Sequence, residues 1–258
     1  MTNRNRMAGR ILGLGAALAL AAGPVPAGAA GVTSFSAGLV WDHFSRTVVW
    51  SGDEAPSRIR AHAVSARAEV GMGGGLVFDL SVGVSFSSFP DMTFSALPIS
   101  LQFTGETIGG LVVGAGLSAP LLEAGDFEIS AAGRIVYSMG MSKTWPLEGF
   151  AVDGRAEGKP DWLEVSLGPR VAYLLPGRIV PYLEIGARWL RADFRMSEVL
   201  GDLEGEEDKK VVGDLAVSVV LGADARVSER ITVVGKAGLM PCAGGVDSLA
   251  SLGLLYRF

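Results

Sequence analysis

Cysteine and histidine are scarce in this chain. Cys242 is the one cysteine, and the two histidines are His43 and His62. A single cysteine cannot form an internal disulfide, and so few histidines and cysteines cannot supply the ligand cluster of a structural zinc site. We therefore expect no metal site and no cofactor. Cys242 is expected to be a free thiol in a loop, with an intermolecular disulfide as the alternative.

Long apolar runs are also missing after the N-terminal region. No later segment approaches the ~18 consecutive apolar residues of a membrane helix, although 49% of the 258 residues are hydrophobic. High apolar content without long runs is typical of a transmembrane β-barrel, whose strands alternate lipid-facing and lumen-facing side chains. The 36 glycines suit a narrow barrel, and the length fits one large all-β domain.

The N-terminal region has the pattern of a secretory signal. Three arginines precede the apolar run 11–22, which is too short to span a bilayer, and small residues follow at 27–29. We predict a signal peptide over 1–29 and a mature domain over 30–258, with an uncleaved anchor helix as the alternative. The first 29 residues hold no acidic residue, so the mature chain is more acidic than the whole and a nucleic-acid partner is not expected.

Period-two alternation of apolar and polar residues recurs along the mature chain. It is clearest between Trp162 and Met196, where Pro176 and Gly177 separate two alternating arms. Such repeats predict an antiparallel up-and-down transmembrane β-barrel of ten strands. The other alternating segments are 34–42, 58–70, 78–86, 110–118, 128–137, 214–226, 231–239 and 248–258.

The segment 89–107 decides the strand number. Single-chain bacterial barrels have even strand numbers, short periplasmic turns and longer outer loops. Counting back from Phe258, the short turns all fall on the periplasmic side only if 89–107 contributes zero or two crossings. We interpret it as an outer loop that forms a hairpin above the membrane; twelve and eight strands are the alternatives. The outer loops are then 45–57, 89–107, 141–161, 197–210 and 241–247.

The C-terminal residues 254–258, Leu-Leu-Tyr-Arg-Phe, complete a recognisable pattern. Together with the signal peptide and the alternating strands, they resemble the small bacterial outer-membrane β-barrel proteins of the OmpA-like class. The resemblance implies a Gram-negative outer-membrane location, contact with lipid and lipopolysaccharide, and a monomer. It also implies that Tyr256 and Phe258 are read by the barrel-assembly machinery. It implies no activity, because this class includes adhesins, pores and enzymes.

Charged side chains of both signs fall on the lumen-facing positions. A barrel of about ten strands is close to the size whose interior is filled by side chains, and an unpaired buried charge is costly. We therefore expect a network of ion pairs in the lumen, with a narrow ion-conducting path as the alternative. The predicted members are Asp42, Arg67, Glu69, Asp79, Glu128, Arg134, Glu164, Arg170, Glu184, Arg188, Asp214, Asp224, Arg226, Lys236 and Arg257.

Asp42 and His43 lie near the outer end of the first strand, where proteases and lipid hydrolases of the resembled class keep their sites. Adjacent strand residues face opposite sides, so these two cannot form a simple catalytic pair and we predict no catalytic residue. His62, with Arg58 and Arg60, is a candidate for contact with anionic lipopolysaccharide, or a mere register irregularity.

The acidic run 201–208 is expected to be a solvated loop, with a divalent-cation site as the alternative. The five tryptophans are expected near the outer boundary as an aromatic girdle. The resulting hypothesis is a non-enzymatic barrel with a structural or interaction role through its outer loops. The alternatives are a small diffusion pore or transport channel, and a protease or lipid-modifying enzyme at the rim.

Overall fold

The computed structural model describes residues 31–258 except 54, 150–151, 175–176 and 243–244. Thirteen strands and one short 3-10 turn (Gly73–Gly75) are found in this part of the chain. Among the described residues, no helix has the length and apolarity needed to cross a bilayer. The predicted signal peptide, 1–29, lies outside the described residues.

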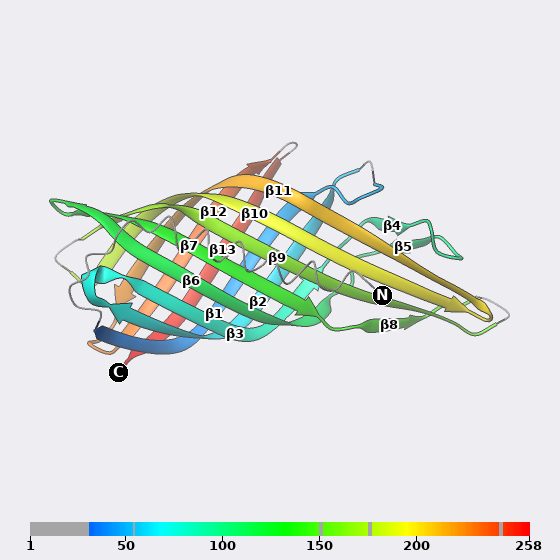
Figure 1. The fold of residues 1–258 in the computed structure, drawn as a ribbon, viewed down its shortest axis with the longest axis horizontal. Coiled ribbons are helices and arrows are strands. Elements are labelled where there is room, and N and C mark those ends of the chain that lie inside the picture. The colour runs from blue at the N-terminus through cyan, green and yellow to red at the C-terminus, as the bar shows by residue number, and fades with distance from the viewer. Residues whose placement is uncertain (1–30, 54, 150–151, 175–176, 243–244) are drawn as a thin grey trace.

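Ten strands form a closed ring (Figure 1). Each pairs antiparallel with the ring strand that follows it in the chain, and the last pairs with the first, so the antiparallel up-and-down barrel is confirmed. The ring strands are β1 (Val32–Val48), β2 (Ser57–Met72), β3 (Val77–Ser88), β6 (Ile108–Ala124), β7 (Phe127–Gly140), β9 (Gly154–Tyr173), β10 (Ile179–Leu200), β11 (Leu203–Arg226), β12 (Ile231–Cys242) and β13 (Gly245–Arg257).

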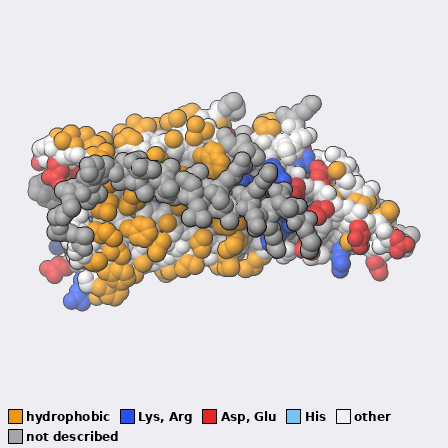
Figure 2. Space-filling view, in the orientation of Figure 1, with side chains coloured by type: hydrophobic (Ala, Val, Ile, Leu, Met, Phe, Trp, Pro, Cys, Tyr) orange, Lys and Arg blue, Asp and Glu red, His pale blue; other side chains and the backbone are white. Residues whose placement is uncertain are grey.

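The outward positions of the ring carry large apolar side chains. Leu39 of β1 is 65% exposed, and its register partners are Leu254 of β13 and Ala66 of β2. Figure 2 shows hydrophobic side chains spread over the barrel wall, whereas charged side chains gather mainly toward the right end of the view, with a few at the left end. An apolar surface of this extent is unfavourable in water. It fits the lipid-facing band of a membrane barrel.

Glycines allow the strands to approach closely. A Cβ on Gly38 would lie 1.8 Å from the Leu254 carbonyl oxygen, and a Cβ on Gly83 would lie 2.0 Å from that of Val64. Neither contact can be relieved without moving backbone. The glycine content therefore reflects the tight curvature of a small ring.

The segment 89–107 forms a small hairpin outside the ring. Its two strands, β4 (Met92–Phe94) and β5 (Leu101–Phe103), pair only with each other. Figure 1 places them at the outer end of the barrel, away from the C-terminus. The predicted hairpin and the count of ten ring strands are thus confirmed.

Several predicted outer loops are strands instead. β10 and β11 remain paired up to Leu200 and Leu203, β1 continues to Val48, and β8 (Lys143–Pro146) pairs with the outer part of β9. The acidic run 201–208 is therefore mainly a strand of a long hairpin, and the loop prediction for it is wrong. The covered face of 197–210 carries Glu198, Glu207 and Lys209 instead of apolar residues, so the apolar alternation on which the sequence prediction relied is missing there.

We predict that the cost of a charge on the outward face depends on its height. Leu39→Arg places an arginine in the middle of the apolar band and should reduce the free energy of unfolding by about 2–4 kcal/mol. Leu203→Arg is the matched control, because Leu203 is similarly exposed but lies in the outer extension. We define this extension as the paired outer parts of β9 (154–160), β10 (194–200) and β11 (203–209), together with β8. Urea unfolding in lipid vesicles measures both; equal costs would contradict the assignment of the band.

Candidate functional site

An apolar core fills the outer half of the lumen. Phe194 of β10 lies at its centre, with ring centroids 5.3 Å from Phe89, 5.6 Å from Phe94 and 5.2 Å from Phe103. These three partners all come from the segment 89–107, so this segment caps the lumen. The strand side chains in the same cluster include Phe44, Val48, Ile59, Ile108, Val112, Trp162, Leu190, Met196, Val211, Met240 and Leu249.

Two tryptophans belong to this core rather than to a girdle. Trp50 is 1% exposed and Trp162 is 4% exposed, and the Trp162 Nε1–H donates to Ser87 Oγ at 3.0 Å. The predicted girdle position is wrong for both. The sequence prediction failed because lumen-facing positions near the outer end are apolar here, so a tryptophan can face either side. Trp41 does lie on the outward face.

Polar contacts fasten the cap to β10 and β11. The Ile99 N–H donates to the buried Glu198 carboxylate at 3.2 Å, and the Ala96 N–H donates to Glu207 at 2.7 Å. Beside them Lys209, also buried, pairs with Asp53 at 2.5 Å. The cap is therefore bound to the rim by directional contacts as well as by apolar packing.

A further contact joins the end of the cap to β8. Lys143 lies 2.6 Å from Glu106, and the Trp145 Nε1–H donates to the same carboxylate at 2.6 Å. These two hydrogen bonds, that of Lys143 first, hold the pKa of Glu106 below its usual value. Because Glu106 is exposed, this contact positions the segment more than it stabilises the fold.

Below the apolar core, charged side chains cross the lumen. One pair joins Arg188 of β10 to Glu164 of β9 at 2.5 Å, and both side chains are buried. Arg188 also donates to Ser218 of β11 at 3.2 Å. One arginine thereby connects three neighbouring strands through the interior.

A second group surrounds Arg67. Its guanidinium lies 3.7 Å from Asp79, 3.9 Å from Glu69 and 4.0 Å from Asp42, and Asp42 lies 3.7 Å from Arg134. These separations exceed hydrogen-bond distance. The buried atoms without a hydrogen-bond partner among the described residues include Arg67 Nε and Nη2, Asp79 Oδ1, Arg134 Nε and Glu164 Oε2. Buried polar groups of this kind are normally satisfied by water.

Two cavities lie along the charged part of the lumen. The smaller cavity, about 70 Å³, is lined by the charged residues Lys236 and Arg134 and by apolar residues of the core. The other, about 320 Å³, lies near the periplasmic turns and is lined by Glu128, Arg226 and Asp224. Asp224 pairs with Arg170 at 2.7 Å.

The structure thus brings together part of the predicted lumen set. Among the described residues, no ion pair within 4.0 Å is found for Glu128, Glu184, Arg226, Lys236 or Arg257. Arg257 is exposed at the end of β13. The pairing role of these five residues remains a prediction.

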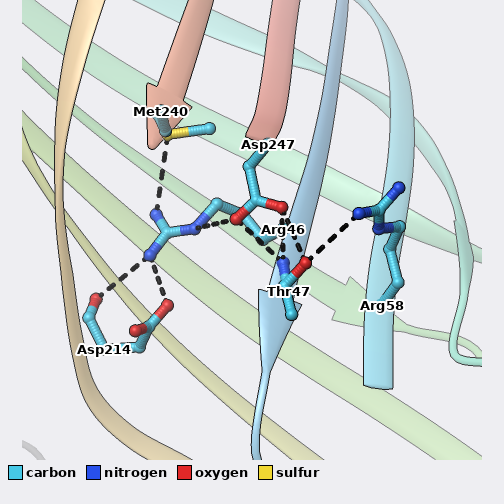
Figure 3. A network of polar contacts seen from close by, with 6 residues as sticks. All are labelled: Arg46, Thr47, Arg58, Asp214, Met240 and Asp247. Atoms are coloured by element: carbon cyan, nitrogen blue, oxygen red, sulfur yellow. Dashed lines mark hydrogen bonds and ion pairs between the residues drawn. The ribbon is translucent and has the colours of Figure 1, made fainter. Parts of the chain in front are cut away.

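Arg46 is the main residue that sequence reasoning missed. It is 1% exposed, pairs with Asp214 of β11, lies 3.8 Å from Asp247 of β13, and donates to the Met240 sulfur of β12 at 3.9 Å (Figure 3). Asp247 in turn accepts the Thr47 N–H at 2.9 Å. Because residues 45–57 were predicted to form an outer loop, Arg46 was not assigned a position in the lumen. The alternation Asp42, Phe44, Arg46 and Val48 would have placed it in the lumen.

Arg46 also lies where the barrel wall loses its regular pairing. The β11–β12 ladder ends at Val219 and Leu239, although β11 and β12 both continue outward. Above that point the Arg46 Nη2–H donates to the Asp214 carbonyl oxygen at 3.5 Å. The arginine therefore bridges the two strands where backbone hydrogen bonds no longer do so.

Asp42 and His43 lie on opposite faces of β1. Asp42 takes part in the lumen pairs, whereas the His43 ring stacks on His62 with centroids 4.4 Å apart, and both lie near the outward Trp41. Among the described residues, no ion pair joins His43 to a carboxylate that could orient its ring. The described residues also contain no group of three or more side chains that could hold a metal ion.

Cys242 lies at the end of β12, so its predicted loop position is wrong.

The proposed assembly residues lie at the periplasmic end of the closing strand. The Phe258 N–H donates to the Phe35 carbonyl at 3.0 Å, and its ring contacts Phe35 and Tyr256 at 5.4 and 5.0 Å. Tyr256 and Phe258 are both exposed on the outward side. Their recognition by the assembly machinery stays a prediction.

Comparison with solved structures settles the fold. The chain superimposes on the outer membrane protease OmpT from Escherichia coli with a TM-score of 0.54 and 10% identity, covering 90% of this chain and 99% of that one. The chain has the fold of a bacterial outer-membrane β-barrel. With the apolar band around the ring, this indicates an outer-membrane protein. At 10% identity, the likeness to OmpT concerns the fold alone.

Other outer-membrane barrels match less closely. The translocator domain of the autotransporter NalP from Neisseria meningitidis gives a TM-score of 0.47 at 12% identity, covering 98% of each chain. The attachment invasion locus protein Ail of Yersinia pestis gives 0.35 at 11% identity, covering 87% of this chain and 97% of that one. No family model and no curated protein matches the sequence.

We predict that Arg46→Ala destabilises the barrel by about 3–5 kcal/mol, because it leaves the buried Asp247 and the partly buried Asp214 without their cation. Arg195→Ala is the control. Arg195 makes exposed ion pairs with Glu206 and Asp208, whose loss should cost less than about 1 kcal/mol. Unfolding in urea measures both, and equal effects would show that the Arg46 network is not a stabilising contact.

Proposed function

We propose that this protein is a non-conducting outer-membrane barrel that acts through its outer extension, as a structural or interaction protein. The observation that carries the proposal is the closure of the lumen by the apolar core under the segment 89–107. A dry apolar layer is a barrier to ions, since transfer of a charge into such a layer is strongly unfavourable.

A second barrier lies beneath the first. The buried Arg188–Glu164 pair occupies the lumen below Trp162. Arg67 and the three acids around it, Asp42, Glu69 and Asp79, also occupy the lumen. Opening a path would require both the apolar contacts and these ion pairs to rearrange. The two layers involve different residues, so they can be tested separately.

The outer extension provides the surface for interaction. The β9, β10 and β11 strands remain hydrogen-bonded beyond the ring, and β8 adds a fourth short strand. A sheet built this way holds its side chains in fixed positions, unlike a loop. Its faces carry ion pairs such as Arg195–Glu206 and exposed apolar residues such as Leu203, which suits recognition of a protein partner.

A gated diffusion pore is the second candidate. It is favoured by the unsatisfied buried atoms of Arg67, Arg134 and Glu164 and by the two cavities, which together mark a part of the lumen that water can enter. In this candidate the segment 89–107 is the gate.

Planar-bilayer recording distinguishes the two candidates. We expect no stable open steps from the purified wild-type protein, because the apolar core and the Arg188–Glu164 pair each close the lumen. A variant in which residues 92–103 are replaced by a short Gly-Ser linker should also remain closed. Combining that replacement with Glu164→Ala and Arg188→Ala should give measurable conductance.

Folding of each variant is checked by its heat-modifiable mobility on a denaturing gel. Leu203→Arg, which leaves the lumen unchanged, is the control for the recording. Stable steps from the wild type would overturn the proposal. Steps from the linker variant alone would instead support the gated pore.

A further inference from the structure

A group of basic side chains lies on the outward face of β1 and β2. We call it the basic patch and define it as Arg58, Arg60 and His62 on β2 with His43 on β1. Strand alternation places the three β2 residues on one face, and Arg60 and His62 are exposed. His43 is the register partner of His62, and their rings stack.

The basic patch lies at the upper edge of the apolar band. The next outward residue of β2 below His62 is Val64, and the register partner of His62 on β3 is Phe86, which is 47% exposed. Trp41 stacks within 6.1 Å of His43 and 6.0 Å of His62. Exposed aromatic residues of this kind mark the membrane–water interface, so the patch is level with lipid headgroups of the outer leaflet.

No acid balances the patch from its own face. Within the described residues, no carboxylate lies within 4.0 Å of a nitrogen of Arg58, Arg60, His62 or His43. The flanking outward positions at this height are uncharged: they are Phe86 and Ser88 on β3, and Ser248 and Ala250 on β13.

The acid closest to Arg58 along the hydrogen bonds is buried and already contacts another arginine. Arg58 donates to Thr47 Oγ1 at 3.4 Å, and Thr47 donates to Asp247 at 2.8 Å. Asp247 is 2% exposed and lies beside Arg46. Arg60 and the two histidines have no such connection among the described contacts.

The opposite side of the barrel differs. There, two outward cations of β10 have partners on the same face: Arg191 lies 3.1 Å from Asp193, and Arg195 lies 2.8 Å from Glu206. The basic patch instead gathers four basic side chains on two adjacent strands without such a partner among the described residues, which argues that its counter-charge comes from outside the chain.

We propose that the basic patch binds a phosphate group of an anionic outer-leaflet glycolipid. The Arg60 guanidinium supplies paired N–H donors that match phosphate oxygens, and Arg58 and the two imidazoles surround the same position. The acyl chains of the lipid lie along the apolar band below, against Trp41 and Phe86. Recognition therefore needs both the phosphate and the acyl chains.

The test uses the full mature barrel in neutral phosphatidylcholine nanodiscs that contain a small fraction of lipid A. Native mass spectrometry measures the fraction of barrels that retain lipid A. The double variant Arg60→Ala, His62→Ala should bind roughly tenfold more weakly or worse, because it loses charged hydrogen bonds. Arg155→Ala is the matched control, since Arg155 is an exposed arginine of the outer extension, and it should bind like wild type.

Two ligand controls define the chemistry. Lipid A without its phosphates should bind the wild type as weakly as lipid A binds the double variant. Glucosamine phosphate, which lacks acyl chains, should not compete at the same concentration. Arg60→Lys keeps the charge but loses the forked donor, so it should show a smaller loss.

Any of three results would overturn the proposal. Unchanged binding by the double variant, or by Arg60→Gln if the double variant does not fold, would exclude the patch. An equal loss in Arg155→Ala would show general electrostatic attraction. Equal retention of the dephosphorylated lipid would show that phosphate is not recognised. None of these outcomes depends on whether the lumen conducts.

Discussion

The rule that no strand edge can be left unpaired in lipid governs this structure. Within hydrocarbon an unsatisfied N–H or carbonyl group costs several kcal/mol, so β13 must return to β1 and close the ring. Closure with ten strands gives a narrow interior. The remaining features of the lumen follow from that narrowness, since every inward side chain must pack, pair or bind water.

The lumen meets this requirement in two different ways. Toward the outside, Phe194 and the side chains of the segment 89–107 pack as they would in the core of a water-soluble protein. Toward the periplasm, arginines pair with acids from neighbouring strands, as Arg188 does with Glu164. Arg46 lies at the junction of the wall and the apolar core, where it replaces backbone pairing between β11 and β12.

The membrane part of the fold was predictable because lipid imposes a period of two on each strand. Leu39 and Leu254 face outward and Asp42 inward, as alternation requires, and parity correctly left 89–107 outside the ring. The part above the membrane was not predictable in this way. There both faces of β10 and β11 contact water or other side chains, so nothing in residues 197–210 distinguishes a strand from a loop. Trp162 was misplaced because the sequence does not state where the polar lumen changes to an apolar one. Arg46 was missed because the first strand was predicted to end before it.

The length of β10 and β11 has a mechanical consequence. At about 3.3 Å per residue, the 22 residues of β10 extend to about 70 Å, far more than the apolar band of about 25 Å even after allowance for tilt. Among the described strands, only β8 to β11 form this extension, so it rises from one side of the barrel and does not surround the barrel mouth. A partner bound at its tip would therefore exert any force on the barrel away from the barrel axis.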